Sequence, residues 1–192
     1  MRFFALVVLA FIASLPARAS DAPLSTAVTP AEALSDLDRL FGELKRERNE
    51  RAAVRIAGQI WAEWRASGSA TVDLMMQWAD DAMKAKKFDI ALDFLDQVVI
   101  LEPDFAEGWN RRATVHFMMN DHAKSMSDIE RTLRLEPRHF AALSGMAGIL
   151  KASGHKKAAL SAYRRVLDIY PMMREAQGEV VTLTEELTGE GI

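Results

Sequence analysis

The residues best suited to chemistry form a cluster of soft metal ligands near the middle of the chain. His116 and His122 flank Met118 and Met119, and Met126 follows. Imidazole and thioether groups favour copper, so the cluster raises a copper-handling hypothesis. However, the two histidines lie six residues apart across a predicted turn, and no histidine pair has the i, i+4 spacing of a helical zinc site. Metal handling therefore stays a remote alternative, and no metal ligands are assigned.

Other catalytic arrangements are missing from the sequence. The chain has no cysteine, and it contains no nucleophile elbow, phosphate-binding loop or zinc-binding histidine pair. Adjacent carboxylates occur at Asp80-Asp81 and at Glu185-Glu186, on faces that helical periodicity predicts to be in solvent. We therefore expect no enzymatic activity and no cofactor.

The elements that carry these residues follow a repeat of thirty-four residues. Pro103, Pro137 and Pro171 stand at this spacing. Small residues keep the same period in two further sets, namely Ala79, Ala113 and Ala147, and Ala91, Ser125 and Ala159, with Ala57 one period earlier. Small side chains allow two helices to approach closely. The period therefore predicts stacked helix pairs.

These positions resemble the pattern of the tetratricopeptide repeat family. Residues 72–171 carry it best, with Trp109 and Ala113 in the middle copy and Tyr163 in the last one. Asn120 and Gly154 suit the turn within a pair, because both tolerate positive φ, and Lys86 stands at the same place in the first copy. The resemblance implies an all-α fold, a short right-handed α-solenoid of helix–turn–helix repeats.

Helix-capping and turn residues, together with the helical periodicity, divide the chain into five parts. We expect a signal peptide (1–19), a flexible leader (20–29), a degenerate first repeat (30–69), three tetratricopeptide repeats (72–171), and a capping helix with a tail (172–192). The predicted helices are about 30–45, 49–64, 72–84, 88–101, 105–119, 122–135, 139–152, 156–169 and 171–187. Trp61 and Trp64 are expected to pack the degenerate repeat against Leu74 and Trp78. The alternative for these two rings is an exposed aromatic platform.

The amino terminus is typical of a secretory signal. Arg2 precedes an apolar run from Phe3 to Leu15, which is too short for the roughly 20 residues of a membrane-spanning helix. The end Ala17-Arg18-Ala19 suits cleavage after Ala19. We therefore expect a periplasmic or secreted protein, most simply in a bacterial envelope, with no membrane insertion after cleavage.

The charge balance argues against nucleic-acid binding. Removing residues 1–19 deletes two arginines and no acid, so 22 basic residues face 27 acidic ones and the net charge falls from −3 to −5. Domains that hold phosphates usually carry a basic excess. Lys45, Arg46, Arg48 and Arg51 alternate with acids, which favours a solvated turn of mixed charge.

The family resemblance also implies a binding face. In tetratricopeptide domains the first helix of each pair lines the concave side, and the corresponding residues here are Met76, Asp80, Met83, Asn110, Thr114, Phe117, Ser144, Gly148 and Lys151. Asn110 can pair with a peptide backbone, whereas Met83 and Phe117 either floor the groove or fill gaps between repeats. The Lys, Asn and Arg clamp of chaperone-binding members is not matched, because Ala141 and Gly145 stand where its last residues belong.

We therefore expect a non-enzymatic protein–protein interaction module, an adaptor or scaffold whose concave groove binds a peptide segment of another envelope protein. The alternative is a structural or self-associating repeat protein without a peptide ligand. The sequence leaves the oligomeric state open.

Overall fold

The computed structural model describes residues 30–189 of the chain, and the side chains of residues 36–189. The described residues form nine α-helices and no strand, which confirms the all-α fold. The helices are α1 (Pro30–Arg46), α2 (Glu50–Arg65), α3 (Ala70–Lys84), α4 (Phe88–Leu101), α5 (Ala106–Met118), α6 (His122–Leu135), α7 (Phe140–Ala152), α8 (Lys156–Ile169) and α9 (Arg174–Gly189). In this part of the chain no helix combines the length and apolar character needed to cross a membrane. The predicted signal peptide (1–19) and leader (20–29) lie outside the described residues.

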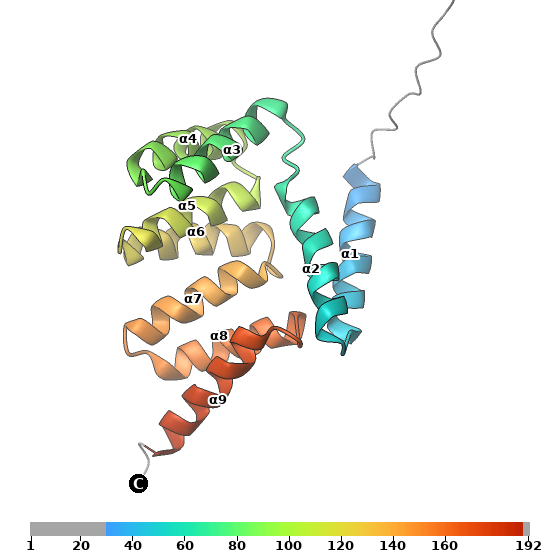
Figure 1. The fold of residues 1–192 in the computed structure, drawn as a ribbon, viewed down its shortest axis with the longest axis vertical. Helices are drawn as coiled ribbons and strands as arrows, with labels where there is room; N and C mark the ends of the chain where they lie inside the picture. The colour runs from blue at the N-terminus through green and yellow to red at the C-terminus, as the bar shows by residue number, and fades with distance from the viewer. Residues whose placement is uncertain (1–29, 190–192) are drawn as a thin grey trace, which may run out of the picture.

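Three helix pairs, α3–α4, α5–α6 and α7–α8, stack in order, and α9 packs on α8 at the end of the stack (Figure 1). The turn within each pair contains one residue of positive φ, namely Lys86 (56°), Asn120 (62°) and Gly154 (78°). The next residue donates its backbone N–H to the carbonyl five residues earlier, at 2.9, 2.8 and 2.8 Å. This Schellman pattern satisfies carbonyls that the helix end leaves open. The three turn residues suggested by the sequence are confirmed.

The small residues of the repeat pattern lie where helices cross. Ala79, Ala113 and Ala147 are at most 2% exposed, and Ala91, Ser125 and Ala159 are at most 1% exposed. The Ser125 hydroxyl donates to the Ala113 carbonyl at 2.8 Å, so a hydrogen bond ties α6 to α5 at this crossing. Any larger side chain at these positions would have to separate the paired helices.

The α1–α2 hairpin does not continue the stack. Figure 1 shows it along the edge where successive pairs connect, beside the starts of α7 and α9. Trp64 packs on Phe140, with ring centroids 4.9 Å apart, and both join the core of α1, α2, α7 and α8. The predicted packing of the tryptophans against Leu74 and Trp78 is wrong, because these two residues are 42% and 45% exposed. The thirty-four-residue period reaches Ala57, yet the hairpin shares its apolar core with α7, α8 and α9 and not with α3.

His139 is the point where the hairpin docks. Its ring stacks on Trp64 at 4.0 Å with an interplanar angle of 7°, and Trp61 approaches it edge-on. The side chain is fully buried and caps α7, since its Nδ1 accepts the N–H of Ala142 at 3.2 Å. With Nδ1 as the acceptor, a neutral imidazole donates from Nε2 to the buried Glu107 carboxylate at 3.2 Å. One imidazole thus connects α2, α5 and α7.

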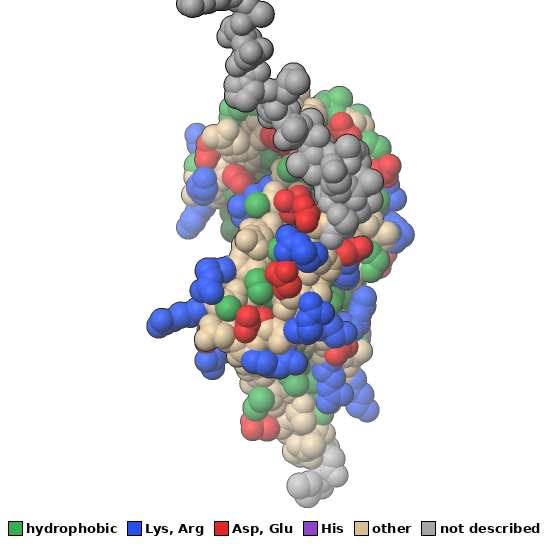
Figure 2. Space-filling model, turned by 90° about the vertical axis from the view of Figure 1, so that its right-hand side faces the viewer, with side chains coloured by type: hydrophobic (Ala, Val, Ile, Leu, Met, Phe, Trp, Pro, Cys, Tyr) green, Lys and Arg blue, Asp and Glu red, His purple; other side chains and the backbone are tan. Residues whose placement is uncertain are grey.

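Ion pairs reinforce the docking at the surface. Arg138 meets Asp38 at 2.6 Å and Arg174 meets Glu50 at 2.7 Å, each joining the hairpin to the stack. Figure 2, which faces this side, shows Lys and Arg interspersed with Asp and Glu rather than a single basic patch. Because exposed ion pairs contribute about 0–1 kcal/mol each, the buried aromatic contacts hold the hairpin in place.

Candidate functional site: a cavity in the concave face

A cavity of about 250 Å³ opens between α5 and α7 on the concave side of the stack. Five of the nine groove residues predicted from the sequence line it, namely Asn110, Thr114, Phe117, Ser144 and Gly148. Residues that sequence reasoning did not assign to the groove complete the wall, among them Ala141, Gly145, Tyr163 and Glu175. Phe117 is 46% exposed, so its side chain faces solvent as well as the cavity.

The repeat register explains why the cavity exists. Glu107 and Arg111 of α5 correspond, thirty-four residues later, to Ala141 and Gly145 of α7. The wall formed by α7 therefore has only small side chains, at Ala141, Ala142 and Ser144, and none at Gly145 and Gly148. A Cβ at Gly145 would lie 3.5 Å from Ile129, which is an ordinary contact, so close packing does not require glycine there. The glycine leaves open space that a larger residue would fill.

Polar groups along the cavity present mainly oxygen lone pairs. Asn110 donates its Nδ2 to Glu107 at 2.8 Å, which leaves Oδ1 as the free amide atom. The Thr114 hydroxyl donates to the Asn110 carbonyl, and the Ser144 hydroxyl donates to the Phe140 carbonyl, both at 2.9 Å. Each hydroxyl hydrogen is therefore used within its own helix. The two hydroxyl oxygens can therefore only accept hydrogen bonds from a group in the groove.

Tyr163 supplies a hydrogen-bond donor. Its side chain is 4% exposed and lines the cavity from α8. A Cβ placed on Gly148 would lie 3.9 Å from the hydroxyl, so this oxygen sits behind the open face of α7. Burial, with smaller contributions from the carboxylates of Glu179 and Glu175, raises the pKa of Tyr163 to about 12. The hydroxyl is thus a neutral donor at physiological pH.

The other four predicted groove residues lie outside the cavity lining. Met76 is buried in the core of α3 and α4, and Met83 packs against that core. Asp80 forms an ion pair with Arg111 at 3.3 Å between α3 and α5. Lys151 meets Glu179 at 2.6 Å. Met83 thus packs in the way that the gap-filling alternative describes, while the two charged residues are held by partners within the stack.

The sequence of the whole chain resembles a known protein. It is 52% identical over 198 aligned residues to a TPR repeat-containing protein of Rhizobium etli, covering 98% of this chain and 97% of the relative. The chain belongs to the tetratricopeptide repeat family. The tetratricopeptide protein named Small glutamine-rich tetratricopeptide repeat-containing protein 2, of Saccharomyces cerevisiae, is 29% identical over 97 residues, which are 50% of this chain and 28% of that one. No protein-family model matches the chain.

Solved tetratricopeptide domains share the fold. The first TPR domain of Spaghetti (RPAP3), bound to the HSP90 peptide SRMEEVD, superposes with a TM-score of 0.59 and 22% identity, covering 62% of this chain and 95% of that chain. The Sgt2 TPR domain from Aspergillus fumigatus gives 0.59 and 18% over 64% and 83% of the two chains. The TPR2B domain of yeast Sti1, in complex with pHsp70, gives 0.57 and 13% over 62% and 99%. These likenesses establish the architecture of the stack.

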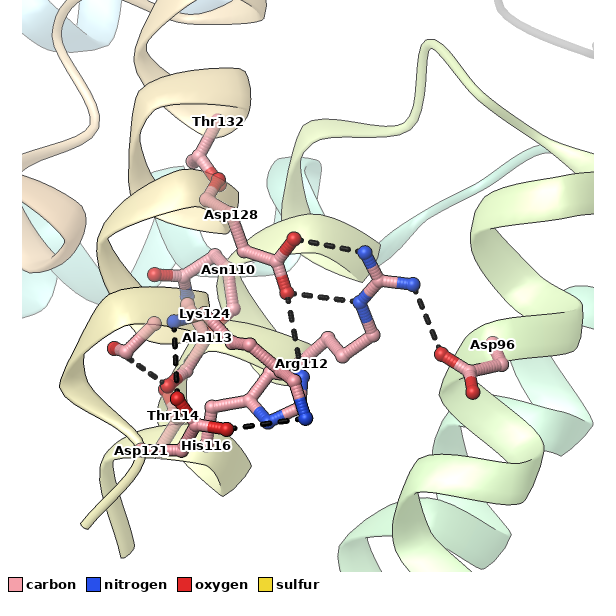
Figure 3. Close-up of polar contacts among 11 residues, drawn as sticks. Asp96, Asn110, Arg112, Ala113, Thr114, His116, Asp121, Lys124, Asp128 and Thr132 are labelled. Carbon is pink, nitrogen blue, oxygen red and sulfur yellow. Dashed lines mark hydrogen bonds and ion pairs between the residues drawn. The ribbon is translucent and has the colours of Figure 1, made fainter. Parts of the chain in front are cut away.

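A buried charge network holds the middle of the tetratricopeptide stack together (Figure 3). Arg112 of α5 binds Asp128 of α6 through two hydrogen bonds of 2.8 Å and reaches Asp96 of α4 at 2.9 Å. Hydrogen bonding to Asp128 raises the pKa of Arg112. His116 lies 3.9 Å from the same carboxylate, and its pKa is lowered mainly by burial. These contacts join α4, α5 and α6, so the network is structural.

The His and Met cluster does not converge on one point. His116 is buried against α6, whereas His122 stacks on Phe117 with ring centroids 5.6 Å apart. Met118 and Met119 are exposed. Within residues 30–189, no group of three or more His, Cys, Asp or Glu side chains is arranged to hold a metal ion. The described geometry therefore gives the copper hypothesis no support.

Proposed function

We propose that the chain is a non-enzymatic interaction module of the cell envelope, an adaptor that holds a peptide segment of another protein in its concave groove. The observation that carries this proposal is the open cavity between α5 and α7. Glycine in a helix interior is unfavourable by about 1 kcal/mol relative to alanine, yet Gly145 and Gly148 both stand there without a packing requirement. Two solved domains that share the fold hold such partners, since the first TPR domain of Spaghetti is bound to an HSP90 peptide and the TPR2B domain of Sti1 is in complex with pHsp70.

Export is part of the proposal. It rests on the segment from Arg2 to Ala19, whose charged start, apolar run and small-residue end are typical of a cleaved signal. Sequencing the amino terminus of protein recovered from the native host tests this point. A mature chain that starts at Ser20 supports export, and an intact Met1 start in a cytoplasmic fraction contradicts it.

Crosslinking in the native host tests the groove. We would compare partners recovered with the wild type, with Gly148→Leu, which fills the cavity, and with the matched control Gly178→Leu on α9, where nothing lies within 4 Å of an added Cβ. The proposal requires a partner that is lost only with Gly148→Leu. An identical partner set in all three would refute use of the groove.

A second candidate function, self-association, has its own observation. Leu74 and Trp78 are 42% and 45% exposed on α3, at the free end of the stack. The residues at the Leu74 position in later repeats, Gly108, Ala142 and Ala176, are all buried. An assembly through this end face predicts a sedimenting mass that rises with concentration in the wild type and not in Trp78→Lys. A constant monomer mass would rule it out.

A further inference from the structure

Two deeply buried polar side chains each direct one unused hydrogen-bonding atom into the cavity. Tyr163 is 4% exposed, and its hydroxyl has no hydrogen-bond partner among the described residues. Asn110 is 7% exposed, and its Oδ1 is likewise free because Nδ2 is committed to Glu107. Neither atom is enclosed by protein, so both reach the open space of the cavity and are available to a ligand there. A donor and an acceptor are the complement of a peptide group, with its C=O and its N–H.

The charges around the cavity are unequal. Among the described residues no Lys or Arg lines the cavity, and the cations on the adjoining helix turns are paired, since Arg111 binds Glu107 at 2.9 Å and Lys151 binds Glu179 at 2.6 Å. Glu175, by contrast, is an exposed carboxylate on the cavity wall and forms no ion pair with any residue that the structure describes. The unmatched charge of the site is therefore negative. Acceptor oxygens of Thr114 and Ser144 add to this preference for donors.

We propose that the cavity selects an extended peptide segment carrying a Lys or Arg side chain. The segment's peptide group binds the Tyr163 hydroxyl and Asn110 Oδ1, its basic side chain reaches Glu175, and a small apolar side chain enters the space left by Gly145 and Gly148. Charge complementarity of this kind steers encounter and excludes partners of the same sign. This specificity rests on the proposed peptide-binding function. The basic segment proposed here is opposite in charge to the acidic peptide SRMEEVD, which is bound by the first TPR domain of Spaghetti.

Selection from a phage-displayed library of short random peptides, on the purified full-length chain, tests the inference. We expect enrichment of Lys or Arg at one fixed position next to small apolar residues. With synthetic copies of the selected peptides, Glu175→Gln should weaken binding about fivefold, a size typical of one partly exposed ion pair. Glu185→Gln, an exposed carboxylate on α9 outside the cavity, is the matched control and should change binding less than twofold by the same argument. Tyr163→Phe keeps the ring and should also weaken binding.

The possible outcomes separate the two levels of the proposal. Basic peptides that lose affinity with Glu175→Gln and with Gly148→Leu support the inference. Peptides that require an open cavity but show no basic preference, or are acidic, overturn the charge selection and leave groove binding intact. If no selected peptide is sensitive to Gly148→Leu, groove binding fails and the charge selection fails with it.

Discussion

Replacing Gly148 with alanine should stabilise the chain, whereas the same replacement at Gly108 should destabilise it. At Gly148 the new Cβ meets nothing closer than the Tyr163 hydroxyl at 3.9 Å. The gain is then the helix propensity of alanine over glycine, about 1 kcal/mol in the free energy of unfolding. At Gly108 the new Cβ would lie 2.8 Å from Val98 Cγ1 and 3.1 Å from Phe105.

The clash at Gly108 cannot relax easily. Val98 is fully buried in the core of α3 and α4, so its methyl group has no free space to enter. Overpacking of this kind costs about 1–3 kcal/mol, which exceeds the propensity gain. We therefore expect a net loss of about 1 kcal/mol at Gly108, near the low end of that range.

Urea unfolding followed by far-UV circular dichroism measures both effects. With a slope of about 2 kcal/mol per M, a change of 1 kcal/mol moves the midpoint by about 0.5 M, upward for Gly148→Ala and downward for Gly108→Ala. Two shifts of the same sign would refute the reasoning, because they would mean that the space around these glycines is not as the structure has it.

Three further predictions follow from the packing and the charges. Trp64→Ala should cost about 3 kcal/mol and should raise amide hydrogen exchange mainly in α1 and α2, because the ring docks the hairpin; unchanged exchange there would contradict this role. Arg112→Ala should lower the free energy of unfolding by about 3 kcal/mol, because it leaves the buried Asp128 carboxylate without its partner. Asp96→Asn, whose side chain is 54% exposed, should lower it by less than about 1 kcal/mol. Equal losses in thermal unfolding would argue against a buried pair. Tyr163 has a folded-state pKa of about 12 against the ordinary value of 10, so the stability that its neutral hydroxyl gives the fold is complete below pH 10 and is lost as the pH rises through 12. Ultraviolet titration of phenolate in Tyr163→Phe and wild type checks this. A Tyr163 pKa near 10 would contradict its burial.

Much of the stack could be predicted from the sequence because its determinants are local and periodic. The small residues at a helix crossing and the residue of positive φ in each turn are read directly from the thirty-four-residue period. The start of α9 was predicted less accurately. Pro171 was expected to open it, but the helix begins at Arg174, and Gln177 instead donates to the Pro171 carbonyl at 2.7 Å.

The position of the α1–α2 hairpin could not be predicted in the same way. Ala57 keeps the period, but the period describes how two helices pair and not which neighbour the pair contacts. The hairpin docks through Trp64 on His139, a residue 75 positions away that also needs Glu107 from a third helix. Such a contact depends on three elements meeting, and no local pattern in the chain indicates it.

The cavity was partly predictable. Rules for the first helix of each pair correctly assigned Asn110 and Gly148 to its wall. They missed Tyr163, because it belongs to the second helix of its pair and reaches the cavity only where the side chains of α7 are small or absent. They also included Lys151, whose ion pair with Glu179 of α9 is not apparent from spacing.

Photocrosslinking from the rim of the cavity tests the central claim most directly. A photoreactive amino acid at Phe117, which is 46% exposed, is compared in the native host with one at Ile100, which is 68% exposed on α4 and absent from the cavity lining. The account predicts a discrete adduct with another protein from position 117 that disappears when Gly148→Leu is added, and none of the same mass from position 100. The same adducts from both positions, or an adduct from 117 that survives Gly148→Leu, would contradict a peptide-binding groove.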